Sequence, residues 1–131
     1  MKVYISCHHP DPANELAAIL REAGHEVVST WHTETGPRPD AADKHSWGLK
    51  ADNNLAQITT ADDLVVIASP EHLSRERCVP GGEFFEAGFA QAHPGMRVFT
   101  VGGVENGMLY ASDVTHVANA TELLQMLRAP S

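Results

Sequence analysis

The 131-residue chain is long enough for one domain with its own hydrophobic core, and we predict a single domain over residues 1–131. Hydrophobic residues make up 43% and charged residues 20% of the sequence, which is typical of a globular protein and argues against disorder. The formal net charge of −8 repels a phosphate backbone, which argues against long nucleic acid as a partner and leaves small nucleosides and nucleotides as candidates.

The sequence predicts a cytoplasmic protein that does not contact a membrane. The apolar run within Met1–Cys7 is too short for a signal peptide, and no stretch approaches the ~20 apolar residues that a membrane span requires. Two cysteines, Cys7 and Cys78, are too few for a disulfide scaffold and indicate reduced thiols, although a single bridge stays open.

Strand and helix patterns alternate along the chain, less clearly between Gly102 and Asp113. Five apolar or β-rich segments predict strands, at 2–6, 25–30, 64–68, 97–101 and 114–117. Four segments predict helices: one that begins at Pro12 after an Asp11 N-cap and is closed by Gly24, and others at 47–60, 81–93 and 121–128, the last capped by Asn119 or Thr121. Residues 31–45 and 69–80 are predicted loops.

This alternation predicts an α/β fold, a three-layer, flavodoxin/Rossmann-like, doubly wound parallel sheet of about five strands. The continuous apolar run Leu64–Ala68 suits a central strand covered on both faces. Ligands bind such sheets at the carboxyl ends of the strands. We therefore expect the loops after Ser6, Thr30, Ser69 and Gly102 to line the site.

The segment Pro80–Ala90 carries the strongest sign of chemistry. Gly81 and Gly82, at the start of a predicted helix, let a ligand approach the backbone N–H groups. Glu86 follows among phenylalanine and alanine neighbours, where a carboxylate serves packing poorly. From these residues alone, Glu86 is either a functional group or a solvated side chain near the favourable end of the helix dipole.

The spacing Gly-Gly-x-x-x-Glu-x-Gly-x-Ala from Gly81 to Ala90 resembles the signature of the nucleoside 2-deoxyribosyltransferase family and its nucleotide N-glycosidase relatives. Four other segments are also similar to the family, in the same order along the chain: Val3–Ile5, Gly24–Trp31, Ala61–Asp62 and Val101–Asn106. The resemblance thus covers nearly the whole chain, and the ordered set is more specific than the glutamate motif alone.

The resemblance implies an enzyme that cleaves or transfers the N-glycosidic bond of a nucleoside or nucleoside 5′-monophosphate without a cofactor. Glu86 matches the family's nucleophile, which attacks the anomeric carbon and forms a glycosyl-enzyme ester. Water or a second nucleobase then resolves the ester, which makes the enzyme a hydrolase or a transferase. Tyr4 matches the tyrosine that orients the nucleophile; the alternative for Tyr4 is a core aromatic.

The chain departs from the family pattern at Asn54. The family's second carboxylate, which assists the leaving base, lies eight residues before the aspartate that matches Asp62, and Asn54 occupies that position. An amide cannot serve as a proton donor at neutral pH. Asp52 cannot replace it, because residues two apart on a helix do not share a face. Either this group need not protonate the base, or catalysis is weakened, so a non-catalytic nucleotide-binding module is the alternative function.

Further residues are candidates for substrate binding. Gly81 and Gly82 are expected to contact substrate, and Cys7 and His8 occupy the loop where relatives contact sugar or phosphate, although His8 also fits a surface histidine. Trp31 can stack on a base or pack in the core.

Asn106 resembles a residue that reaches a neighbouring subunit's site, and the apolar loop Gly103–Tyr110 would otherwise be exposed. These features predict a homodimer or a larger homo-oligomer.

Two other interpretations are disfavoured. The eight histidines are scattered, with no HxxxH pair and no Cys-His cluster, so we predict no metal site. A flavodoxin-like redox domain would need a flavin phosphate loop, which is not evident.

Asp62 and Asp63 are expected to cap or terminate structure and not to react.

Overall fold

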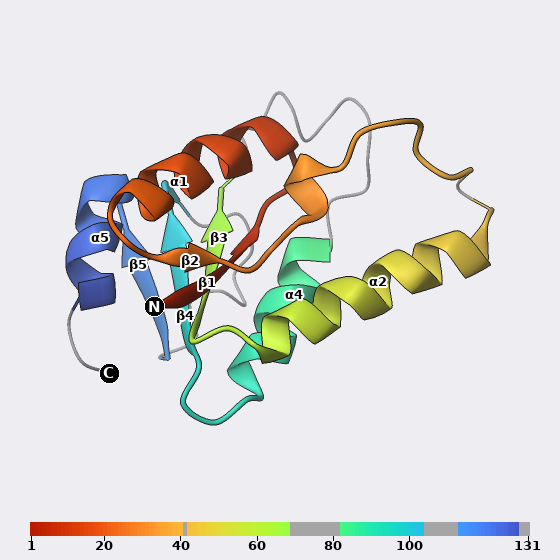
Figure 1. Cartoon of the computed structure of the whole chain (residues 1–131). Coiled ribbons are helices and arrows are strands. Elements are labelled where there is room, and N and C mark those ends of the chain that lie inside the picture. The colour runs from red at the N-terminus through yellow and green to blue at the C-terminus, as the bar shows by residue number, and fades with distance from the viewer. Residues whose placement is uncertain (41, 69–81, 104–112, 129–131) are drawn as a thin grey trace.

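The computed structural model describes residues 1–40, 42–68, 82–103 and 113–128, in which strands and helices alternate (Figure 1). The strands are β1 (Lys2–Ser6), β2 (Glu26–Val27), β3 (Asp63–Ile67), β4 (Arg97–Val101) and β5 (Val114–Val117). The helices are α1 (Pro10–Glu22), the short 3₁₀ helix η1 (Trp31–Thr33), α2 (Lys44–Thr59), α4 (Gly82–Gln91) and α5 (Ala120–Arg128). No described helix is both long and apolar enough to cross a membrane.

The strands form one parallel sheet in the order β2-β1-β3-β4-β5. This confirms the predicted α/β fold. The chain leaves β1 toward β2 on one side and then returns to place β3 on the other side. The direction of winding therefore reverses between β1 and β3, and the carboxyl ends of these strands are where such sheets bind ligands.

Helices cover both faces of the sheet (Figure 1). On one face, alternate strand residues such as Val3 and Ile5 pack with apolar side chains of α1 and α5. On the other face, Tyr4, Leu64 and Val66 pack with residues of α2 and α4. This division follows from the two-residue period of a strand, which sends neighbouring side chains to opposite faces. It also places Tyr4 on the same side of the sheet as α4.

Two predicted boundaries in the first half of the chain were wrong. Helix α1 begins at Pro10 with His9 as its N-cap, two residues before the predicted start, because proline is tolerated throughout the first turn, where the N–H groups have no helical partner. Strand β2 has two residues instead of six. The Ile5 N–H donates to the Ser29 side-chain oxygen at 3.1 Å, and this bond replaces further backbone pairing with β2.

Helix α2 also starts earlier than predicted. Asp43 caps it by accepting a hydrogen bond from the Ser46 N–H at 3.0 Å, which places Lys44 at the first helical position. At α5, Asn119 is the cap, since its side-chain oxygen accepts from the Glu122 N–H at 3.0 Å. Gly24 closes α1 as predicted, with a φ of +92°.

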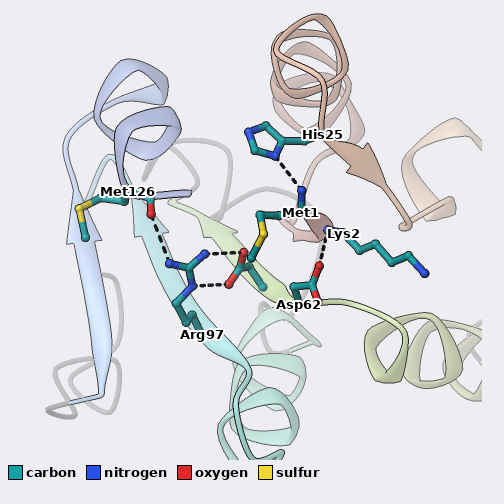
Figure 2. A network of polar contacts seen from close by, with 7 residues as sticks. Met1, Lys2, His25, Asp62, Arg97 and Met126 are labelled. Carbon is teal, nitrogen blue, oxygen red and sulfur yellow. Dashed lines mark hydrogen bonds and ion pairs between the residues drawn. The ribbon is translucent and has the colours of Figure 1, made fainter. Parts of the chain in front are cut away.

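The amino ends of the strands carry a polar network (Figure 2). Asp62 accepts a hydrogen bond from the Lys2 N–H at 2.7 Å. Asp63 is buried and accepts two bonds from the Arg97 guanidinium, at 2.7 and 3.0 Å. Both aspartates thus make structural contacts at the edge of the sheet opposite the expected site, but Asp63 is the first residue of β3 and pairs with Arg97 instead of capping or ending an element.

Candidate functional site

Two hydroxyl side chains near the carboxyl end of β1 face α4. Tyr4 and Ser6 are two residues apart on the strand and so share one face of the sheet. Both are fully buried. They are held in place because β1 is paired with β3 from Val3 to Ser6 and the backbone of Ile5 between them is bonded to Ser29 and to Trp31.

Glu86, in the second turn of α4, lies against these hydroxyls. The Tyr4 hydroxyl donates to Glu86 Oε2 at 2.6 Å, and the Ser6 hydroxyl donates to Glu86 Oε1 at 2.7 Å. Each carboxylate oxygen thus has one fixed donor and keeps a second lone pair. The contact predicted between Tyr4 and Glu86 is present, while the catalytic roles of both residues stay predictions.

The surroundings of Glu86 act on its pKa in two opposite directions. Burial raises the pKa of the Glu86 carboxyl above its ordinary value, and the negative charge of Glu83 adds to this. The hydrogen bonds from Tyr4 and Ser6 act in the opposite direction by favouring the carboxylate. Burial also raises the pKa of Tyr4, with a further contribution from the charge of Glu86, so Tyr4 stays a neutral hydrogen-bond donor.

A pocket of about 750 Å³ lies beside this carboxylate. Its volume is suited to a small organic ligand. Four parts of the chain form its wall: the start of the loop after β1, the segment from η1 to residue 39, the side of α2, and the first turns of α4. The lining residues are Cys7, His8, Pro10, Trp31, Glu34, Thr35, Gly36, Pro37, Arg38, Pro39, Trp47, Lys50, Ala51, Asn54, Leu55, Glu83, Phe85 and Glu86.

Most of the predicted site residues meet in this pocket. Cys7, His8, Trp31 and Asn54 line it together with Glu86. Trp31 also packs against the core, and its indole N–H donates to the Ile5 carbonyl at 2.8 Å, so this tryptophan both packs and faces the pocket.

The remaining expectations fall partly outside the described residues. Gly82 is the first residue of α4. Gly81 and Asn106 lie outside the described residues, as do most of the loops after Ser69 and Gly102. The loops after Ser6 and Thr30 do line the pocket, as expected.

Two polar residues of the site, Ser6 and Glu83, were not predicted from the sequence. Strand periodicity could have found Ser6, because it shares a face with Tyr4. Helix periodicity could have found Glu83, because residues three apart on a helix are neighbours and Glu83 precedes Glu86 by one turn. Glu83 is 5% exposed and lines the pocket, and its Oε1 is buried with no hydrogen-bond partner among the residues that the structure describes.

The pocket rim carries charges of both signs. The Lys50 ammonium pairs with the Glu34 carboxylate at 2.6 Å. Arg38 and His8 line the same pocket and offer further hydrogen-bond donors. Within the described ranges, no three His, Cys, Asp or Glu side chains gather in a way that could hold a metal ion.

The parallel sheet with helices on both faces, together with the half-buried Glu86 carboxylate beside a pocket at the carboxyl ends of its strands, defines an α/β fold with a candidate ligand site at its switch point. The chain shares this fold with a 2-deoxyribosyltransferase from Bacillus psychrosaccharolyticus, at 18% identity and a TM-score of 0.65 over 95% of this chain and 90% of the other. It shares it as well with the CMP N-glycosidase BcmB of Clostridium botulinum, at 17% identity and a TM-score of 0.54 over 97% and 98% of the two chains. The sequence matches no protein-family model and no curated protein. The predicted likeness to deoxyribosyltransferase-like proteins is thus confirmed in the fold.

Proposed function

We propose that this protein cleaves or transfers the N-glycosidic bond of a nucleoside or nucleoside 5′-monophosphate through a covalent ester on Glu86. The observation that carries the proposal is the carboxylate of Glu86 at the pocket wall, held by the Tyr4 and Ser6 hydroxyls. A carboxylate fixed by two donors beside a ligand-sized pocket is the arrangement that nucleophilic catalysis at an anomeric carbon requires.

The two hydrogen bonds serve both halves of the reaction. They orient the carboxylate so that one lone pair can attack the anomeric carbon while the base leaves with the electrons of the C–N bond. They then stabilise the carboxylate that is released when water or a second base attacks the ester. Because Tyr4 stays protonated, it donates in every step.

The named activities of the two fold relatives support the substrate class. One is a 2-deoxyribosyltransferase linked to nucleoside synthesis, and the other is a CMP N-glycosidase, so both act at the bond between a sugar and a base. Four further residues line the same pocket. In this proposal Cys7 and His8 bind sugar or phosphate, Asn54 binds base or sugar, and Trp31 stacks on the base.

The test is a panel of ribo- and deoxyribonucleosides and their 5′-monophosphates, with base release followed by chromatography. We expect release by the wild type, none by Glu86→Gln, and wild-type rates for the matched control Glu22→Gln, an exposed glutamate on α1. Acid-quenched wild-type protein should gain the mass of one pentosyl group on Glu86. Adding a second free base separates transfer from hydrolysis.

A non-catalytic nucleotide-binding module is the second candidate, and the amide of Asn54 in the pocket favours it. In that case calorimetry would detect binding of a panel member by the wild type, with no base released and no pentosyl adduct. Base release that depends on Glu86 would exclude this alternative.

A further inference from the structure

Glu83 is the most unusual polar group of the pocket. Only 5% of the residue is exposed, yet it lines the pocket. Its Oε1 is buried and has no hydrogen-bond partner among the described residues. A buried carboxylate oxygen without a donor is costly, because the charge has lost its water and gained nothing in exchange. Such a group is explained most simply by a ligand that supplies the missing partner.

Glu83 and Glu86 form an unequal pair. They are one helical turn apart and interact electrostatically, and the charge on Glu83 disfavours charge on Glu86. Glu86 has two hydroxyl donors to stabilise a negative charge, whereas Glu83 Oε1 has none. The two carboxyls thus differ in their contacts: Glu86 is held by two donors, as a nucleophile requires, whereas Glu83 Oε1 is left for a group of the ligand.

We infer that Glu83 is the proton donor and acceptor of the proposed reaction, the role for which Asn54 is unsuited; this inference rests on the proposed function. Asn54 and Glu83 line the same pocket from different helices, α2 and α4. An amide at position 54 can bind the base but cannot protonate it. The carboxyl of Glu83 on α4 supplies the proton instead.

The step balances without any further reactant. As the C1′–N bond breaks, its electron pair goes to the base nitrogen, which takes the proton of Glu83, while the carboxylate of Glu86 forms the ester bond to C1′. In the second half, the Glu83 carboxylate takes a proton from water or from a second base as that molecule attacks C1′. As this new bond to C1′ forms, the bond between C1′ and the Glu86 oxygen breaks, and its electron pair returns to Glu86.

The experiment compares leaving groups that need a proton with one that does not. Wild type, Glu83→Gln and the control Glu22→Gln are assayed on the nucleoside panel and on 4-nitrophenyl β-D-ribofuranoside and its 2-deoxy counterpart. For Glu83→Gln we expect base release to fall by roughly 10²–10⁴-fold and 4-nitrophenol release to change by less than about tenfold, because 4-nitrophenolate leaves without protonation. Glu83→Ala should recover base release when sodium formate is added as an external acid and base.

The outcomes separate this inference from the function on which it rests. If the wild type releases neither base nor 4-nitrophenol, the proposed function fails, and the inference fails with it. If the wild type is active and Glu86→Gln is not, but Glu83→Gln slows both kinds of substrate equally or neither of them, Glu83 has no role in proton transfer and the proposed function survives. Unfolding curves are recorded for each variant to detect a damaged fold. A loss of activity caused by a damaged fold affects both kinds of substrate and is scored as the equal loss just described.

Discussion

Replacement of Tyr4 by phenylalanine tests how Glu86 is activated. The substitution removes one hydroxyl and the 2.6 Å hydrogen bond to Glu86 Oε2, while the ring still fills its fully buried position beside Leu64 and Val66. We therefore expect the fold to persist. The carboxylate keeps Ser6 as its only fixed donor among the described residues and becomes free to rotate about that contact.

The expected loss follows from the strength of the missing bond. A hydrogen bond to a charged group contributes about 1.5–3 kcal/mol, which corresponds to a reduction of kcat/KM by roughly 10- to 150-fold if the bond is fully used in the transition state. The bond also favours the charged form of Glu86. Without it, the already raised pKa of Glu86 rises further, so activity should be lost at a higher pH than in the wild type as the solution is made more acidic.

The assay is the pH profile of kcat/KM on the substrate of the panel that is cleaved fastest. The same substitution in a Glu86→Gln background should change the residual rate very little, because the two residues act through one bond. If Tyr4→Phe keeps kcat/KM within about threefold of wild type and leaves the acidic limb of the profile in place, Tyr4 is a packing residue and the orientation argument is refuted.

Four further predictions concern stability, the proton donor and assembly. Because burial raises the folded-state pKa of Glu86, stability should fall as pH rises through the titration range of this group. Glu86→Gln should therefore raise the unfolding midpoint more at pH 7 than at pH 4, and an unchanged or lower midpoint at pH 7 would contradict this. Asn54→Asp alone should increase base release by less than about tenfold, whereas combined with Glu83→Gln it should restore part of the lost rate. A large increase from Asn54→Asp alone would mean that Asn54 stands where a proton-donating carboxyl has been lost. Asp63→Asn should cost roughly 2–4 kcal/mol in urea unfolding, because it breaks a buried pair with Arg97, and an effect below about 1 kcal/mol would refute that role. Light scattering at micromolar concentration should give a dimer or larger species, and a clean monomer would count against the predicted assembly.

The sequence by itself determines the strands, the helices and the fold class, because the patterns that predict them lie within short segments of the chain. The runs at β3, β4 and β5 are apolar enough to predict strands within one residue of their bounds, and alternation with helices implies a parallel sheet. The glutamate motif likewise selects Glu86 by its neighbours along the chain. Element ends were less predictable, since competing starts such as Pro10 and Pro12 are nearly equivalent until the helix is packed.

The tertiary structure decides which side chains meet. Ser6 and Glu86 are 80 residues apart and touch only because β1 pairs with β3 inside the sheet and α4 packs on its Tyr4 face. In the sequence, Glu83 looks like an ordinary acidic residue of a first helical turn. Only the structure shows that it is buried and that its Oε1 has no hydrogen-bond partner among the described residues. Burial and pairing depend on the whole packed molecule, so the presence of Glu83 and Asn54 in one pocket is visible only after α2 and α4 are packed on the sheet.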